Sequence, residues 1–257
     1  AGGGSCDCKP YARLGVILHR RTPHQGTRNI TVRREESVVF VPGVPSHLTN
    51  LIQMRPSEID GILKFLRAAE SMKIETRTAW TSDGAPESVA SHTWRLCLWG
   101  LVFADRFPEV DTERLLKICL IHDLGEAISG DISAVEQPPD GKADQEREDL
   151  LTLTESLPDA ARQEIVELWE EYEAASTPEA RLAKGLDKLE TILQHIQGEN
   201  PADFDYHFNL SYGTTYTKAS PLLTEVRTVL DEATQEEALK QTGRRNGGAE
   251  ASSESDR

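Results

Sequence analysis

The sequence has no apolar stretch long enough to cross a membrane. A membrane-spanning helix needs about 20 mostly apolar residues, and no such run occurs in these 257 residues. The first residues also lack the continuous apolar segment that a secretory signal requires. We therefore expect no membrane association.

Positive charge is scarce as well. Lys and Arg together number 28 against 43 Asp and Glu, which gives a formal net charge of -15. Nucleic acids and anionic lipids attract clustered Lys and Arg, so we expect neither as a partner. A phosphate-bearing small molecule would need positive charge from a metal ion or from a few well-placed basic side chains.

The four cysteines do not form the pattern of a disulfide scaffold. Cys97 and Cys119 lie within apolar helical stretches, where a thiol behaves as a small hydrophobe. Cys6 and Cys8 are too close in sequence for a standard bridge. Unpaired thiols are typical of a reducing compartment, so we expect a cytoplasmic protein.

The chain divides into three zones by composition. These are an irregular and partly disordered N-terminal extension at 1–55, a folded domain at 56–240, and a disordered tail at 241–257. The extension holds two short apolar runs, at 14–18 and 38–41. Strand patterns are nearly absent beyond it, so we expect an all-α domain.

Helical periodicity predicts the elements of this domain. Helices are expected to start near 57 and to cover 89–103, 115–124, 144–157, 159–175, 179–197 and 219–239. The helix over 89–103 is opened by Pro86-Glu87-Ser88 and is apolar on most sides, which predicts a central, buried position. The segment 131–143 is expected to be a loop, and 198–213 to be irregular.

The pair His122-Asp123 is the first sign of chemistry. It ends an apolar helix and offers one nitrogen and one oxygen ligand, the mixture that suits borderline divalent metals. Glu126 would lie on the same helical face and could act beside a metal without binding it. An ordinary surface pair at a helix end, where the helix dipole favours His, is the alternative.

His92 and Asp187 complete a possible ligand set. Each has an ordinary explanation alone, as a hydrogen-bonded core histidine and as a solvated or salt-bridged aspartate. With His122 and Asp123, however, they provide two imidazoles and two carboxylates, which would neutralise a divalent ion and leave positions open for water and phosphate. We therefore expect these four residues to form a metal site.

The order of these residues resembles that of the HD-domain metal-dependent phosphohydrolases. The likeness is greatest to the small HD proteins that include the 5'-deoxynucleotidases. It spans about 57–235 and depends on three stretches, 86–92, 121–131 and 186–190. The resemblance implies an HD-domain helical bundle, a homodimer, a nucleotide substrate, and one divalent ion (Mn, Co, Mg, Fe, Ni or Zn) on the four ligands.

The resemblance also assigns roles beyond the metal. Glu126 and Asp131 match acidic residues that assist catalysis or contact the substrate, and Arg77 and Trp80 match a region that contacts the nucleotide. An exposed arginine and a packing tryptophan are the alternatives. The segment after Trp80 departs from the family pattern, because it is shorter and has Thr81-Ser82-Asp83-Gly84 in place of an Arg-containing stretch. The identity of the nucleotide therefore stays open.

The activity that the resemblance implies is removal of phosphate from deoxynucleoside monophosphates. Two alternatives remain: an HD hydrolase of nucleoside triphosphates or signalling nucleotides, and a non-catalytic nucleotide-binding HD scaffold. We expect the monophosphatase, because the domain is small and has no additional catalytic or sensor domain, and because no expected ligand is missing.

Overall fold

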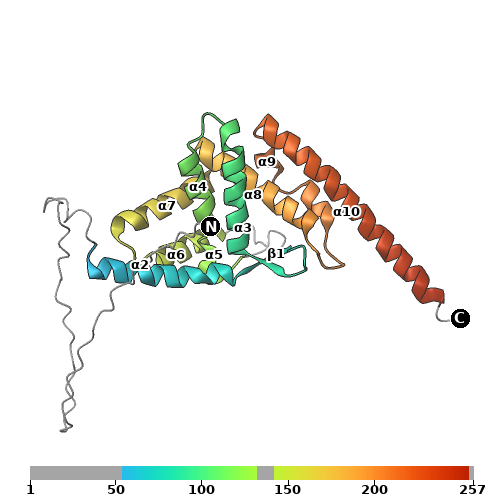
Figure 1. The fold of residues 1–257 in the computed structure, drawn as a ribbon, viewed down its shortest axis with the longest axis horizontal. Coiled ribbons are helices and arrows are strands. Elements are labelled where there is room, and N and C mark those ends of the chain that lie inside the picture. The colour runs from blue at the N-terminus through green and yellow to red at the C-terminus, as the bar shows by residue number, and fades with distance from the viewer. Residues whose placement is uncertain (1–53, 132–141, 255–257) are drawn as a thin grey trace, which may run out of the picture. The chain divides into compact units, whose positions relative to one another are not determined.

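Helices make up most of the protein (Figure 1). The computed structural model describes residues 54–131 and 142–254; the apolar runs at 14–18 and 38–41 and most of the expected loop at 131–143 lie outside this part of the chain. The described elements are α2 (Pro56–Ala68), η1 (Ala69–Lys73), β1 (Thr76–Trp80), β2 (Pro86–Ser88), α3 (Val89–Phe103), η2 (Ala104–Arg106), α4 (Thr112–Ile121), α5 (Glu126–Ser129), α6 (Lys142–Leu153), α7 (Asp159–Ala174), α8 (Pro178–Gln197), η3 (Tyr206–Leu210), α9 (Thr214–Thr217) and α10 (Pro221–Glu254).

Short polar side chains begin the three helices that form the core, α3, α4 and α8. Ser88, Asp111 and Thr177 precede them, and each side chain accepts a hydrogen bond of 3.1–3.2 Å from the backbone N–H three residues further on. These bonds satisfy donors that have no partner within the helix. The sequence-based prediction of an all-α domain is confirmed.

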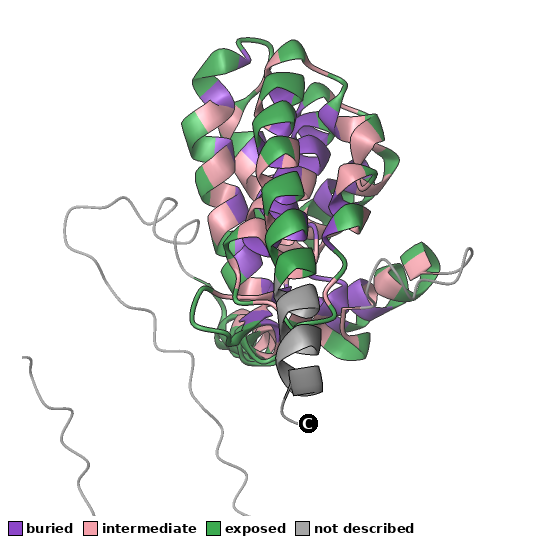
Figure 2. Cartoon of the chain, turned by 90° about the vertical axis from the view of Figure 1, so that its right-hand side faces the viewer, coloured by how far each residue is buried: buried purple, intermediate pink, exposed green. Residues whose placement is uncertain are grey.

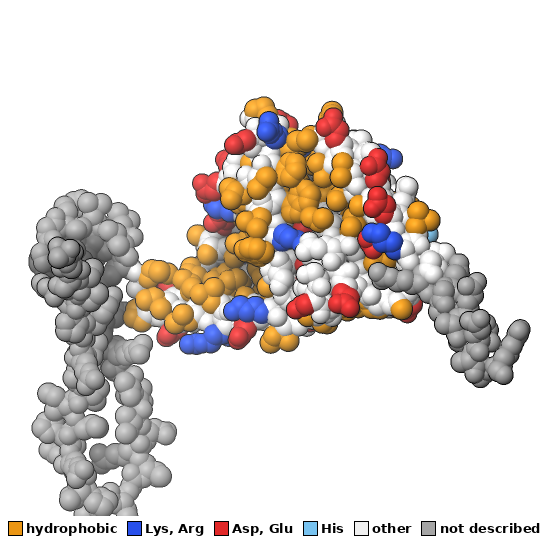
Figure 3. Space-filling view, turned by 45° about the vertical axis from the view of Figure 1, so that its right-hand side comes forward, with side chains coloured by type: hydrophobic (Ala, Val, Ile, Leu, Met, Phe, Trp, Pro, Cys, Tyr) orange, Lys and Arg blue, Asp and Glu red, His pale blue; other side chains and the backbone are white. Residues whose placement is uncertain are grey.

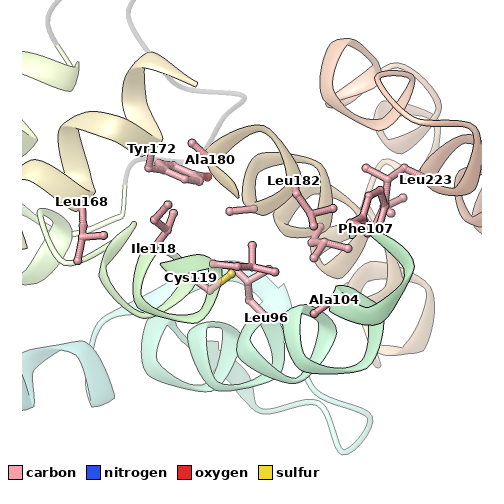
Figure 4. Close-up of a cluster of buried hydrophobic side chains, with 14 of the residues drawn as sticks. Leu96, Ala104, Phe107, Ile118, Cys119, Leu168, Tyr172, Ala180, Leu182 and Leu223 are labelled. Atoms are coloured by element: carbon pink, nitrogen blue, oxygen red, sulfur yellow. The ribbon is translucent and has the colours of Figure 1, made fainter. Parts of the chain in front are cut away.

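Helix α8 lies at the centre of the domain. Buried residues lie on the inner sides of the helices (Figure 2). Most of its 20 residues are buried, and α3, α4, α7 and α10 all pack against it. Its Leu182, Leu186, Leu189 and Ile192 enter one apolar cluster with Leu96 and with residues of α4, α7 and α10 (Figure 4). Burial of this cluster is the main apolar contribution to the stability of the domain.

The prediction that the helix at 89–103 has a central, buried position is wrong. The observed bounds of α3 agree with it, but Trp94, Leu101 and Val102 are 65%, 57% and 71% exposed. One face of α3 packs on α4 and α8, and the opposite face is apolar yet uncovered by the part of the chain that the structure describes. Apolar composition shows that a helix has no polar face, but it does not show which neighbour covers each side.

The structure also differs from the sequence prediction ahead of α3. Pro86–Ser88 is not the first turn of the helix but strand β2, which pairs antiparallel with β1 through Thr76–Ser88 and Trp80–Pro86. Gly84, with φ 81°, closes the connection, a conformation that glycine adopts without strain. Strand β2 is only three residues long, so alternation of polar and apolar residues is too brief to be recognised there.

Several helix boundaries also differ from expectation. Helices α4 and α6 end three and four residues earlier than expected. Helix α2 begins at Pro56, one residue before the expected start near 57, and the Glu58 carboxylate accepts the backbone N–H of Arg55 at 2.8 Å. Helix α10 continues to Glu254, beyond the expected end near 239 and into the segment predicted to be a disordered tail. None of the helices in the described part of the chain has the length and apolarity of a membrane span.

Replacing Leu186 with Ala tests the central position of α8. Leu186 is fully buried, so removing its branched end leaves a cavity, and we expect unfolding free energy to fall by about 2–5 kcal/mol. Chemical denaturation measures the change. Leu239→Ala is the control, since Leu239 is 73% exposed and its truncation should cost less than about 0.5 kcal/mol. Equal losses in the two variants would contradict the position of α8.

Candidate functional site

Three helices bring the expected ligand residues together. His92 lies in the first turns of α3, His122 ends α4 with Asp123 directly after it, and Asp187 lies in the middle of α8. Because these three helices pack against one another, their side chains can meet in the space between them. Residues separated by about 95 positions in the sequence thus share one small volume.

The distances within this group are short. His122 Nε2 lies 3.0 Å from Asp123 Oδ2, and His92 Nε2 lies 3.6 Å from that oxygen and 3.2 Å from Asp187 Oδ1. One ligand atom each from His92, His122 and Asp123 fits within 4.8 Å of the others. The imidazole centroids are 5.4 Å apart. The four side chains therefore converge as the sequence predicts.

Hydrogen bonds at Nδ1 orient both imidazoles. His122 Nδ1 donates to the carbonyl oxygen of Cys119 at 2.8 Å, and His92 Nδ1 donates to the Glu190 carboxylate. The Nε2 of His92 then faces both aspartates and that of His122 faces Asp123, and both atoms are buried without a hydrogen-bond partner. Two carboxylates this close together beside two imidazoles need a positive charge among them, either a proton on an imidazole or a bound cation. The residues present therefore fit a divalent metal ion.

The charges around the group support the same conclusion. Burial and the charge of Arg77 lower the pKa of His92, but the carboxylates of Glu190 and Asp187 outweigh both and raise it to about 10. Burial raises the pKa of Asp123, yet the His122 charge and hydrogen bond bring it below the usual range. The cluster is thus rich enough in negative charge to hold an added positive charge.

Asp187 is held by two further side chains. Its Oδ2 accepts a hydrogen bond from the Tyr172 hydroxyl at 2.9 Å and lies 2.8 Å from Lys188 Nζ. Burial raises the pKa of Asp187, but the charges of Lys188 and His92 hold it well below its ordinary value. Oδ1 remains directed at His92. One oxygen of Asp187 is therefore available to a metal, while the other is fixed in place.

Glu126 and Asp131 lie beside the metal ligands. Glu126 begins α5 and is buried, with Oε1 3.4 Å from Lys142 Nζ and Oε2 without a hydrogen-bond partner. Burial, together with the charges of Asp123 and Asp131, raises the pKa of Glu126 to about 10. Asp131 follows Gly130 and is half-buried. Both side chains face the same cavity as the ligands.

A cavity of about 700 Å³ lies over this group. His122, Asp123 and Asp187 line it at one place. Its basic lining residues are Arg77, Lys142, Lys184 and Lys188, and its aromatic lining residues are Trp80, Tyr172, Phe204, Phe208 and Tyr212. The cavity therefore combines a possible metal centre, local positive charge and aromatic surface within a protein that is acidic as a whole.

Arg77 and Trp80, the two residues expected to contact a substrate, both line the cavity. One terminal nitrogen of Arg77 donates to Thr191 Oγ1 at 3.0 Å. The other is buried without a hydrogen-bond partner, 3.7 Å from Glu190 Oε2 and 3.9 Å from Glu87 Oε2. Arg77 is therefore not an ordinary exposed arginine, and it retains donor capacity.

Several residues of the site were not singled out from the sequence. Glu190 orients His92 and also accepts a hydrogen bond from Arg95 at 2.6 Å, and Tyr172 and Lys188 hold Asp187. Glu190 could have been found, since it lies three residues after Asp187 and shares its helical face. Tyr172 gives no local signal, because it belongs to α7 and reaches the site only through packing.

Replacing Glu190 with Gln tests whether this carboxylate prepares His92 for a metal. A neutral amide is a weaker acceptor for Nδ1–H, so we expect metal affinity to fall about 10- to 100-fold. A metal titration by calorimetry measures the change. The control is Glu179→Gln, because Glu179 is also buried on α8 but accepts the backbone N–H of Asp111, at 2.8 Å, outside the cavity. Unchanged affinity in Glu190→Gln would contradict the prediction.

Known proteins share both the sequence and the fold. A profile of the HD domain family matches residues 69–227. The 5'-deoxynucleotidase HDDC2 of Mus musculus is 37% identical over 143 residues, which are 54% of this chain and 71% of the relative. The protein of the same name from Danio rerio is 39% identical over 139 residues, 53% of this chain and 68% of the relative.

A solved structure from Magnetospirillum magnetotacticum MS-1, described as a "predicted metal-dependent phosphohydrolase", superposes with a TM-score of 0.63. The match covers 74% of this chain and 97% of that one at 23% identity, which supports the fold alone. The family profile covers more than half of the chain and includes all four expected metal ligands. This protein belongs to the HD domain family.

Proposed function

We propose that this protein is a divalent-metal-dependent 5'-deoxynucleotidase, which removes phosphate from deoxynucleoside monophosphates. The observation that carries the proposal is the pair of buried, unpartnered Nε2 atoms that face Asp123 and Asp187, two residues that line a cavity together with Arg77. The family supports a phosphohydrolase, and the relatives named 5'-deoxynucleotidases suggest the substrate.

The metal would be held by His92, His122, Asp123 and Asp187. A divalent ion there would supply water activation and neutralise charge on the phosphoryl group. The carboxylates balance its charge, and the hydrogen bonds at Nδ1 keep both imidazoles pointing inward. The donor set accepts several first-row ions, so we leave Mn, Co, Mg, Fe, Ni and Zn as candidates.

Basic side chains would bind the phosphate. Arg77 has a terminal nitrogen without a hydrogen-bond partner, and a guanidinium suits the geometry of phosphate oxygens. Lys188 Nζ lies 2.8 Å from Asp187 and adds a second positive charge beside the ligands. Together they would offset the charge that makes phosphomonoester hydrolysis slow without a catalyst.

We assign proton handling to Glu126. Its carboxyl group is buried on the cavity wall and has one oxygen without a partner, so it can exchange a hydrogen bond with a water that attacks the phosphorus. Asp131 also lines the cavity and is more exposed than Glu126, so we assign it a contact with the substrate. Trp80 would contact the nucleoside part.

Phosphate release from a nucleotide panel tests the proposed function, with Asp123→Ala as the inactive variant. We expect the wild-type protein with Mn, Co or Mg to release orthophosphate from deoxynucleoside monophosphates. Asp123→Ala should lose both activity and bound metal, because one ligand and one balancing charge are removed. Elemental analysis measures the metal content. The control is Asp105→Ala, because Asp105 is an exposed aspartate outside the cavity.

Other products would point to the other candidates. Pyrophosphate or triphosphate as the product would favour a hydrolase of nucleoside triphosphates or signalling nucleotides. Nucleotide binding without any product, in metal-loaded protein, would favour a non-catalytic scaffold. Full metal content in Asp123→Ala would show that the ligand assignment is wrong.

We also propose that the protein is a homodimer that uses the uncovered face of α3. Trp94, Leu98, Leu101 and Val102 follow one another at helical spacing on this face and are 39–71% exposed. Figure 3 shows hydrophobic side chains gathered on one face of the molecule. Arg95, the one charged residue of α3, is paired with Glu190, so two copies could meet here without like-charge contact despite the net charge of -15.

A charge placed on this face should prevent association. We expect Val102→Asp to give a monomer in sedimentation velocity where the wild type is a dimer, because the buried carboxylates would face each other across a two-fold contact. Val229→Asp is the matched control, since Val229 is 64% exposed on α10. A wild-type monomer, or a Val102→Asp dimer, would contradict the proposal.

We propose the cytoplasm as the location, because the thiols of Cys97 and Cys119 are unpaired and stay reduced there.

A further inference from the structure

Aromatic rings gather at one part of the cavity. Phe204 is half-buried and lines the cavity, and three rings meet it nearly edge-on. The centroid of His195 lies 4.8 Å away at 71°, that of Tyr206 5.0 Å away at 71°, and that of Trp80 6.2 Å away at 87°. These contacts fix the plane of the Phe204 ring before any ligand arrives.

Residues of helix α8 extend from the expected metal ligands to this aromatic cluster, so their spacing gives the distance between the two. Asp187, Thr191 and His195 lie at intervals of one helical turn, and all three line the cavity. At a rise of 1.5 Å per residue, His195 is about 12 Å from Asp187 along the helix axis. Thr191, which accepts a hydrogen bond from Arg77, lies between them. A polar zone therefore separates the ligands from the aromatic cluster.

The backbone that carries the cluster is fixed to neighbouring helices. The Trp80 carbonyl accepts a hydrogen bond from Gln194 of α8. Gly198 packs so closely on that carbonyl that a Cβ there would lie 2.1 Å from the oxygen. Gln241 of α10 donates to the carbonyl of Phe204 at 2.9 Å. The aromatic surface is thus held in place from both sides, as a preorganised binding slot requires.

The two ends of the cavity differ in charge. The two residues beside Phe204 in the sequence, Asp203 and Asp205, are acidic and also line the cavity. A phosphate is disfavoured beside them, whereas Arg77 and Lys188 attract it close to the metal ligands. A molecule that suits both ends carries an anionic group at one end and a flat uncharged ring at the other.

We propose that the Phe204 ring, with Trp80 packed edge-on against it, forms one wall of a slot in which the nucleobase stacks, and so makes the enzyme select nucleotides over simple sugar phosphates. This inference rests on the proposed nucleotidase function for its phosphate end. Every base has a π-face, and stacking on an aromatic side chain is tolerant of base identity. Phe204 lies in the irregular segment after α8, outside the stretches that carry the family resemblance.

The test compares two substrates that differ only in the base. Deoxyadenosine monophosphate has the base, and 2-deoxyribose 5-phosphate has the same sugar and phosphate without it. We expect Phe204→Ala to raise KM for deoxyadenosine monophosphate about 5- to 100-fold, the range of a lost stacking contact, and to leave kcat unchanged. Hydrolysis of 2-deoxyribose 5-phosphate should not change.

Two variants control the measurement. Phe204→Tyr keeps an aromatic face and should retain most of the selectivity for deoxyadenosine monophosphate. Phe103→Ala removes another half-buried phenylalanine, which stacks on Trp99 at 5.2 Å and does not line the cavity, and it should alter neither substrate. Equal losses for both substrates in Phe204→Ala, or no loss for either, would overturn the proposal.

Calorimetric titration with deoxyadenosine, without metal, separates this inference from the proposed function. Deoxyadenosine has no phosphate, so its binding depends on the base and sugar alone. We expect it to bind the wild type and Phe103→Ala, and to bind Phe204→Ala about 5- to 100-fold more weakly. If the wild type releases no phosphate but shows this binding pattern, the proposed base-binding slot is supported and the proposed nucleotidase function is contradicted. If the wild type does not bind deoxyadenosine, the slot is refuted.

Discussion

The structure depends on one constraint: the carboxylates buried on the central helix α8 must be compensated by positive or hydrogen-bonding groups. Asp187 and Glu190 both lie in the interior, where an unpaired carboxylate would cost several kcal/mol. Two elements that pack on this part of α8 supply compensating groups: His92 and Arg95 come from α3, and Arg77 comes from β1. The residues of the candidate site are therefore part of the core of the protein.

This arrangement explains why the two imidazoles are so well defined. Each Nδ1–H has an acceptor that belongs to a packed helix, which leaves Nε2 as the nitrogen that faces the aspartates. Neither ring can rotate without losing a buried hydrogen bond. A metal would then find its nitrogen ligands already oriented, with Asp187 held by Tyr172 and Lys188.

The same helix also relates the parts of the cavity to one another. Because α8 is rigid, the spacing of Asp187, Thr191 and His195 along it sets how far a bound molecule extends from the metal ligands. The β1–β2 hairpin and the segment after α8 form other parts of the cavity wall, to which they contribute Arg77, Trp80 and Phe204. The proposed site of phosphate chemistry and the proposed site for the rest of the substrate are thus separated by two turns of one helix and lie in the same domain.

The sequence by itself determined the helical class, most helix boundaries and the residues that form the proposed metal centre. Periodicity and capping are local, and His122-Asp123-Leu124-Gly125-Glu126 is a contiguous signal. Only the tertiary structure decided that α8 rather than α3 is central, that Pro86–Ser88 is a strand, and that Glu190, Tyr172 and Phe204 reach the cavity. The physical reason is that burial and side-chain partners depend on which elements pack together, and residue order does not state this.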